Sequence, residues 1–265
     1  MADIICERTD SVLVIKMARA KANALNPAFV AELREAFREA AADVSVRAVV
    51  LASAFERIFS GGFDAKEVFP MGEAEIRAHF ARFVDLYQAM LKLPKPLIAA
   101  VGGHAMAGGA VLALACDQRV MAEGDYGFSL NEVNLGISHT PGVVQMTINA
   151  AGHRAAWELL LGGVTIQPAE CARIGLAVEL APAGTALDRA LFRAKALGAQ
   201  PAGAFADVKR VFREVALGES RRDATEGVDG FVRAWVSAES VELRRALTQA
   251  MGGGATRSQL QVGKT

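Results

Sequence analysis

Short apolar runs rich in β-branched residues alternate along the chain with longer stretches that carry apolar residues at helical spacing. The runs predict strands over residues 12–17, 47–51, 97–101 and 119–121. Asn26 and Pro27 form an N-cap and a first helical position, and the apolar periodicity after them predicts a crossover helix. A second crossover helix is predicted over 73–91, ended by Pro94 and Pro96. This alternation predicts an α/β protein with a parallel, mostly buried sheet.

Beyond about Pro182 the strand pattern stops and the chain is typical of helices, which we predict over 185–197, 201–216, 221–237 and 241–251. One helix carries an apolar row of Val228, Phe231, Val232 and Trp235. We expect the row to pack on the core or on a neighbouring subunit, the alternative being an ordinary amphipathic helix in its own domain. We therefore divide the chain into a core over 1–195, a helical C-terminal part over 196–252 and a tail over 253–265 that is predicted to be disordered.

Composition excludes several classes of protein. The chain has 265 residues, of which 52% are hydrophobic, enough for one large core or two modest ones. Its 29 basic and 29 acidic residues cancel, so no overall charge attracts polyanions and nucleic acid is not expected as a partner. The three cysteines lie far apart and indicate neither a disulfide framework nor a zinc site, which fits a reducing compartment.

Two segments bear on targeting. The first ten residues carry acids where a signal peptide would carry bases, so secretion is not expected and a cytoplasmic location is predicted. Residues 97–116 contain no Asp, Glu, Lys or Arg and are long enough to span a membrane. His104 and two Gly-Gly pairs interrupt this segment and favour a buried strand, a turn and a buried helix. A membrane span is the alternative, and no membrane partner is predicted.

Two glycine-containing turns follow predicted strands and offer backbone N–H groups. The first has the sequence FSGGFD over 59–64, and the second has AGGA over 107–110 and opens a helix. Unpaired amides and the positive end of the dipole at a helix start favour a developing negative charge. Together the turns are able to form an oxyanion hole, and tight turns of purely structural use are the alternative.

Three segments, in order and spacing, resemble the signature of the crotonase superfamily, which contains enoyl-CoA hydratases and isomerases. They are IFSGGFDAKE over 58–67, LIAAVGGHAMAGGAVLALACD over 97–117 and FSLNEVNLGI over 128–137. The resemblance covers roughly residues 5–250. It implies an α/β spiral of ββα units with a helical C-terminal part that trimerises. It also implies an acyl-CoA substrate, no cofactor beyond the coenzyme A of that substrate, no metal, and a homotrimer or a hexamer built as a dimer of trimers.

The resemblance also assigns residues to the binding of the thioester. Its two oxyanion amides fall on Phe63 and Gly108, where they would hydrogen-bond the thioester oxygen as charge builds on it. Phe63 stands where relatives have alanine, and its ring either narrows the acyl pocket or packs in the core. Asp64 matches an acid in many relatives, and we expect it to accept backbone hydrogen bonds within the turn.

The coenzyme A loop of the family looks like the sequence KANAL here. It places Lys21 and main-chain groups of Ala22 and Ala24 at the coenzyme, the latter two near the adenine. Lys66 matches a lysine just past the first oxyanion turn and would act as a mobile charge beside phosphate. Solvated surface side chains are the alternative for both lysines.

The carboxylates distinguish the branches of the family. Hydratases use two glutamates, because water must be activated and the α-carbon protonated in one addition. The alignment places the first at Val111, which cannot exchange protons, and the second at Glu132, with one extra residue in the intervening loop. One carboxylate is sufficient to move a proton from C2 to C4 of a 3-enoyl thioester. The isomerase branch also resembles the chain in the Asn131-Glu132 pair and in AAGHRAAWELL over 150–160.

We therefore predict a Δ3,Δ2-enoyl-CoA isomerase in which Glu132 is first base and then acid. Alternatives are another crotonase reaction, either enoyl-CoA hydration or thioester hydrolysis, and a non-catalytic CoA-binding subunit. None of the four histidines needs a catalytic role, although His104 and His139 lie close to motifs.

Overall fold

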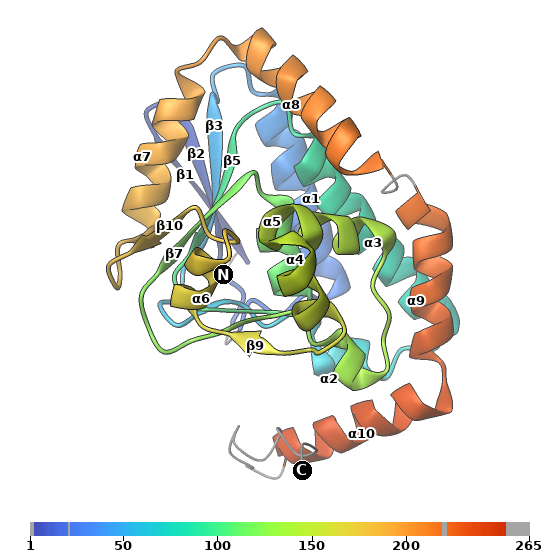
Figure 1. Ribbon diagram of the computed structural model, residues 1–265. Coiled ribbons are helices and arrows are strands. Elements are labelled where there is room, and N and C mark those ends of the chain that lie inside the picture. Colours follow the sequence, from blue (N-terminus) through green and yellow to red (C-terminus); the bar gives the residue numbers. More distant parts are fainter. Residues whose placement is uncertain (1–2, 21, 219–221, 253–265) are drawn as a thin grey trace.

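A computed structural model describes residues 3–20, 22–218 and 222–252, and these residues form two β-sheets (Figure 1). The larger sheet has the strand order β1-β2-β3-β5-β7-β10 and the smaller sheet has the order β4-β6-β8-β9. The strands are β1 (Ile4–Thr9), β2 (Val12–Met17), β3 (Ala48–Ser53), β4 (Ile58–Ser60), β5 (Leu97–Val101), β6 (His104–Met106), β7 (Gln118–Ala122), β8 (Phe128–Ser129), β9 (Thr165–Ile166) and β10 (Glu179–Ala181).

The larger sheet confirms the predicted parallel arrangement. β2, β3, β5, β7 and β10 run parallel, and only β1, which the sequence pattern did not predict, joins this described sheet antiparallel. In register, Val14 pairs with Val50, and Val50 pairs with Ile98. Every residue of β5 is buried, as expected for a strand with helices on both faces.

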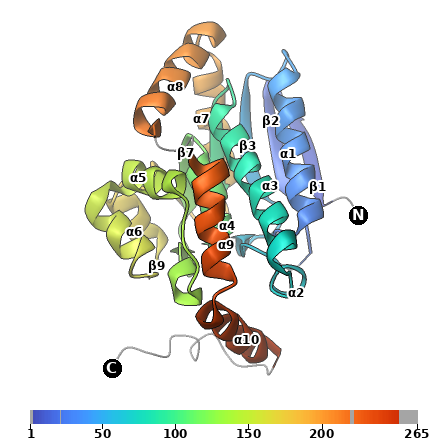
Figure 2. The same ribbon diagram turned by 90° about the vertical axis from the view of Figure 1, so that its right-hand side faces the viewer.

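Helices cover both faces of this sheet. They are α1 (Pro27–Ala42), α2 (Ala65–Val68), α3 (Glu73–Lys92), α4 (Gly108–Ala115), α5 (Pro141–Leu160), α6 (Pro168–Arg173), α7 (Ala186–Gly198), α8 (Ala202–Ala216), α9 (Val228–Trp235) and α10 (Ala238–Gly252), with a 3-10 helix η1 (Glu132–Leu135) and a π-helix η3 (Asp223–Gly227). α1 and α3 lie side by side on one face, and α7 covers the other (Figures 1 and 2). The predicted N-cap is present, because Asn26 Oδ1 accepts from Phe29 N at 2.9 Å.

The smaller sheet is absent from the sequence prediction. Its strands have two or three residues each, too few to show an alternating pattern. β6 lies inside the uncharged segment 97–116, which folds as β5, β6 and α4 and so agrees with the predicted strand, turn and buried helix. Within the described residues, no helix is both long and apolar enough to cross a membrane.

The described chain beyond Pro182 is helical, as predicted, but the helix expected over 221–237 is divided into η3 and α9. The wider π-helical turns occur where buried Asp223 accepts two hydrogen bonds from other elements. α9 then runs along α3 (Figure 2), with the Phe231 ring stacked on Phe80 at 3.6 Å between centroids. The apolar row is therefore covered by the core of the same chain. The tail over 253–265 lies outside the described residues.

α8 packs with its polar side inward. Lys209, which is buried, and Arg213 both pair with Asp117, at 2.7 and 2.8 Å, and Asp117 also accepts from Leu97 N. The opposite face of α8 exposes four large apolar side chains at helical spacing: Val208, Val211, Phe212 and Val215. This exposed row, which we call the α8 apolar face, has no cover within the described chain.

Candidate active site

The smaller sheet brings the three motifs together. β4, β6 and β8 are parallel neighbours, so their carboxyl ends lie at one edge of the sheet. Residues 61–64 follow β4, residues 107–109 follow β6, and residues 130–132 follow β8. The carboxyl ends of parallel strands are where α/β proteins bind ligands. Segments far apart in the sequence therefore meet at one candidate site.

The two glycine turns are in direct contact. A Cβ atom built on Gly62 would lie 3.2 Å from Gly108 N, and Gly62 has a φ of +84°, which disfavours other residues. A Cβ atom on Gly109 would lie 2.3 Å from the carbonyl oxygen of Ser60. Only glycine therefore allows the start of α4 to approach the end of β4 this closely.

The amides of Phe63 and Gly108 are free to bind a ligand. Leu25 and Phe63 form a parallel β-bridge, in which Leu25 N donates to Gly62 O and Asp64 N donates to Leu25 O. Phe63 N takes no part in this bridge and points away from Leu25. Within the described chain neither Phe63 N nor Gly108 N donates to a protein acceptor. Gly108 is also the first residue of α4, where helix amides carry partial positive charge. Ala107 before it has a strained φ of +48°, a feature that concentrates at functional sites.

Glu132 is the first residue of η1 and comes shortly after β8. Its side chain is 13% exposed, and burial raises the pKa of its carboxyl group, an effect that the nearby His139 opposes. Oε2 of Glu132 has no hydrogen-bond partner in the described residues, and Nε2 of His139 lies 3.5 Å from it. A raised pKa in a buried carboxyl group is typical of a group that exchanges protons.

Sequence reasoning missed the contact between His139 and Glu132. The chain reverses between them, because Gly136 ends η1 in the left-handed conformation and Ile137 N donates to Glu132 O at 3.1 Å. That glycine is the signal that could have indicated the return. His104 has a different place, since its Nδ1 accepts from Gly127 N at 3.0 Å and so joins β6 to the loop before β8.

The predicted coenzyme A loop packs directly on the first oxyanion turn. Gly61 N donates to Ala22 O at 2.9 Å, and Ser60 Oγ donates to Asn23 O at 2.8 Å. Asn23 is fully buried and donates from Nδ2 to Ser53 Oγ and Phe59 O. Lys21 lies outside the described residues. The main chain of Ala22 is thus held beside the turn that contains Phe63.

Arg19, which sequence reasoning also missed, ties this loop to α2. Its Nη1 donates to Ala24 O and to Asp64 Oδ2, both at 2.8 Å. Asp64 accepts from Lys66 N at 3.0 Å, which confirms its local role in the turn. Burial opposes ionisation of Asp64, but Arg19 and the N–H groups of α2 lower its pKa overall. Lys66 is exposed on α2, beside these fixed groups.

The Phe63 ring belongs to an aromatic cluster formed with α3 and α9. Its centroid lies 4.6 Å from the His79 ring, 5.2 Å from Phe83 and 6.3 Å from Phe231. His79 is 1% exposed, and burial lowers its pKa to about 4, so the imidazole is neutral near pH 7. Phe83 also reaches the second turn, 3.4 Å from a Cβ atom built on Gly108. Apolar rings therefore border the two free amides.

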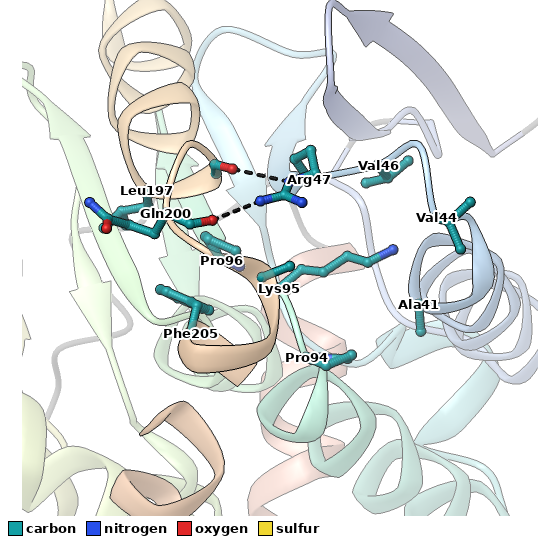
Figure 3. A pocket seen from close by; sticks show the side chains of 12 residues that line it. Ala41, Val44, Val46, Arg47, Pro94, Lys95, Pro96, Leu197, Gln200 and Phe205 are labelled. Carbon is teal, nitrogen blue, oxygen red and sulfur yellow. Dashed lines mark hydrogen bonds between the residues drawn. The ribbon is translucent and has the colours of Figure 1, made fainter. Parts of the chain in front are cut away.

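Two hollows lie away from this site. One, of about 250 Å³, is at the amino ends of β3 and β5, where Arg47 donates to the carbonyl oxygens of Gly198 and Gln200 (Figure 3). The other, of about 540 Å³, lies beyond the carboxyl ends of β3, β5 and β7. None of the predicted site residues lines either hollow.

The profile of the family described as enoyl-CoA hydratase/isomerase matches residues 7–240, which is most of the chain. The chain belongs to the enoyl-CoA hydratase/isomerase family. Membership in this family confirms the crotonase resemblance.

Relatives in the enoyl-CoA hydratase/isomerase family carry different activities. The structure of human mitochondrial delta3-delta2-enoyl-CoA isomerase is similar with a TM-score of 0.91 and 25% identity, over 96% of this chain and 100% of that chain. Carboxymethylproline synthase from Pectobacterium carotovorum is 33% identical over 84% of this chain and 90% of its own. A putative enoyl-CoA hydratase from Thermus thermophilus is 34% identical over 81% of this chain and 84% of its own. Similarity to these relatives therefore leaves more than one reaction open to this site.

Proposed function

We propose that the protein isomerises 3-enoyl-CoA to 2-enoyl-CoA. The observation that carries the proposal is one buried carboxyl group, Glu132, at the same sheet edge as two free amides, those of Phe63 and Gly108. Val111, at the position of the first hydratase glutamate, is buried in α4 and cannot exchange protons. A single proton carrier beside an oxyanion hole fits a reaction that moves one proton within the substrate.

The reaction begins when the thioester oxygen accepts hydrogen bonds from Phe63 N and Gly108 N. The carboxylate of Glu132 removes a proton from C2, and the electron pair of that bond moves toward the carbonyl to form a dienolate. The two amides and the start of α4 stabilise its negative charge. Glu132 then returns the same proton to C4, which leaves the double bond between C2 and C3. No proton, electron or water is consumed.

The coenzyme A part of the substrate is proposed to bind along the loop over 22–25. Main-chain groups of Ala22 and Ala24 would contact the adenine, and Lys66 would pair with phosphate from its exposed position on α2. Arg19 supports this arrangement, because it joins the Ala24 carbonyl to the cap of α2. The coenzyme and the thioester oxygen thereby bind to segments that are hydrogen-bonded to each other.

A panel of 3-enoyl, 2-enoyl and saturated acyl-CoA thioesters tests the proposal, with products identified by mass and by double-bond position. We expect conversion of the 3-enoyl thioester to the 2-enoyl thioester without a change in mass. Addition of water to the 2-enoyl thioester would instead establish hydration, the activity named for the Thermus relative. Release of free coenzyme A would establish thioester hydrolysis, and binding without turnover would establish a non-catalytic subunit.

A further inference from the structure

We propose that His139 is a positioning residue that holds the side chain of Glu132 ionised and oriented as the base, an inference that rests on the proposed function. Two buried polar atoms face each other here, Nε2 of His139 and Oε2 of Glu132, at 3.5 Å. Their side chains are 9% and 13% exposed. Neither atom has a hydrogen-bond partner elsewhere among the described residues. Each is therefore the nearest polar group able to offset the cost of burying the other.

The backbone beside His139 is fixed by a buried network. Thr140, fully buried, caps α5 by accepting from Val143 N at 3.3 Å, and its Oγ1 lies 2.9 Å from the Tyr87 hydroxyl. Tyr87 donates to Asp223 at 2.6 Å, and Asp223 also accepts from the first turn of α5. Because these groups are buried and mutually hydrogen-bonded, the imidazole is presented to Glu132 from a rigid segment.

The charged groups on the elements packed around this pair are either exposed or held by other partners. α10 packs against η1 and carries Glu239, Glu242, Arg244 and Arg245. The first two and Arg245 are exposed, whereas Arg244 is buried, donates to Trp235 O and Ser240 Oγ, and stacks on the Trp235 ring. α4, packed against α5, contains no titratable side chain. η3 contributes Asp223, held by Tyr87, and Glu226, paired with Arg222.

Among the described residues, His139 is therefore the one side chain whose basic nitrogen lies at ion-pairing distance from the Glu132 carboxyl group. A carboxylate that acts as base must be ionised before it takes the C2 proton. An imidazolium cation at 3.5 Å, or a neutral imidazole N–H directed at Oε2, favours the ionised form over the protonated form. His139 gives up no proton in this step, because the proton that Glu132 takes from C2 is returned to C4.

The sign of the pH dependence follows from these contacts. Burial raises the pKa of Glu132, and His139 opposes that increase. Loss of the imidazole removes the larger of the two contributions that oppose burial, the other being a hydrogen bond from the Glu132 backbone, so the carboxyl group stays protonated to a higher pH. The acidic limb of the pH profile of kcat/KM is then expected to move to higher pH, because the protonated form of Glu132 is inactive as a base.

The test compares His139→Leu, which removes the polar group, with His139→Gln, which keeps an N–H donor without a titratable charge. For His139→Leu we expect kcat/KM on 3-enoyl-CoA to fall about ten-fold along the acidic limb of the parent profile and to reach the parent value on the alkaline plateau, which corresponds to an acidic limb displaced by about one pH unit. His139→Gln should lie between this variant and the parent. His153→Leu, an exposed histidine of α5, is the matched control and should reproduce the parent profile.

A second measurement is independent of turnover. The infrared absorption of the protonated Glu132 carboxyl group, isolated by subtracting the spectrum of Glu132→Gln, is titrated in the parent and in both His139 variants. A shift of the Glu132 titration to higher pH in His139→Leu supports the proposal. An unmoved titration and an unmoved acidic limb, with a rate lowered equally at every pH, would overturn it. A parent that titrates as expected but isomerises nothing would overturn the proposed function and leave the role of His139 toward Glu132 standing.

Discussion

A single carboxyl group determines what this site is able to do. Glu132 is buried, its pKa is raised, and it follows the strand that lies beside the start of α4. The other hydratase glutamate, the first of the two, is replaced by Val111, in a helix whose residues are all buried. The proposed isomerisation therefore depends on one proton carrier and on backbone amides, and three substitutions separate these contributions.

Replacing Glu132 with glutamine keeps the shape of the side chain and removes its proton exchange. We expect isomerisation to fall by about 10²-fold or more while acyl-CoA binding changes little. Steady-state rates and a binding titration measure the two effects. Turnover within a few-fold of the parent would exclude Glu132 as the base.

Gly108→Val tests the second turn. A Cβ atom at this position would lie 3.1 Å from Leu25 Cδ1 and 3.4 Å from Phe83, and the branched side chain would extend over the free amide. Catalysis should be lost, because the thioester oxygen can no longer approach Gly108 N. A melting curve and acyl-CoA binding are needed beside the rate. A folded variant with full activity would remove this turn from the mechanism.

Val111→Glu tests why the protein should be a poor hydratase. Residue 111 lies one turn into α4, so a glutamate there would extend toward the centre that Gly108 helps to form. We expect a small gain in hydration of 2-enoyl-CoA, limited by a raised pKa of the new buried carboxyl group and by apolar packing that excludes water. Loss of 2-enoyl absorbance with detection of the 3-hydroxyacyl product measures it. Efficient hydration by the parent itself would show that the isomerase assignment is wrong.

Between elements, one buried network joins the C-terminal part to the core. Asp223 of η3 accepts from Tyr87 of α3 at 2.6 Å and from Gly142 N of α5 at 2.7 Å. Burial raises the pKa of Asp223, and these donors oppose that increase. The network closes the start of α5 and fixes the segment that contains His139.

Asp223→Ala should lower the free energy of unfolding by about 2–3 kcal/mol, because it leaves the Gly142 amide buried without an acceptor and removes the shorter of the two hydrogen bonds of the Tyr87 hydroxyl. Tyr87→Phe removes only one of these hydrogen bonds and should cost about 1 kcal/mol. Denaturant unfolding measures both variants. Glu226→Ala, exposed on the same π-helix, is the control and is expected to stay within about 0.5 kcal/mol of the parent. Equal stability of Asp223→Ala and this control would contradict the prediction.

At the scale of the whole molecule, helix α8 exposes its apolar side to solvent. The α8 apolar face includes Phe212 at 65% exposure and Val215 at 82%, while Lys209 on the other side is buried against Asp117. A helix whose polar side is held by its own sheet and whose apolar side meets solvent is typical of a subunit interface. We therefore propose that the α8 apolar face lies in a contact between subunits of the predicted homotrimer or hexamer.

The double substitution Phe212→Glu and Val215→Glu should therefore shift the assembly toward monomers, because charges would be buried at the interface. Sedimentation velocity or light scattering gives the mass in solution. Val44→Glu, at another site that is 93% exposed, should leave the mass of the parent unchanged. A trimer that persists in the double variant would show that α8 lies outside the interface.

Much of the fold follows from local pattern. The β-branched runs correctly predicted β2 and β5, and Asn26 with Pro27 marked the start of α1, because burial periodicity and capping depend on residues that are close in sequence. The family motifs likewise consist of short segments, so they could be recognised with residue numbers attached. The chain itself thus determined the fold class, the family and the candidate base.

Tertiary structure decided what surrounds those residues. Arg19 bonds to Asp64 across 45 positions of sequence, and the strands that align the two oxyanion turns with Glu132 have only two or three residues each. No periodicity marks such contacts, since they form only when separate elements pack and bury polar groups that must then find partners. The pairing of His139 with Glu132 arises in the same way. Its consequence for the pH at which the base is ionised belongs to the folded molecule alone.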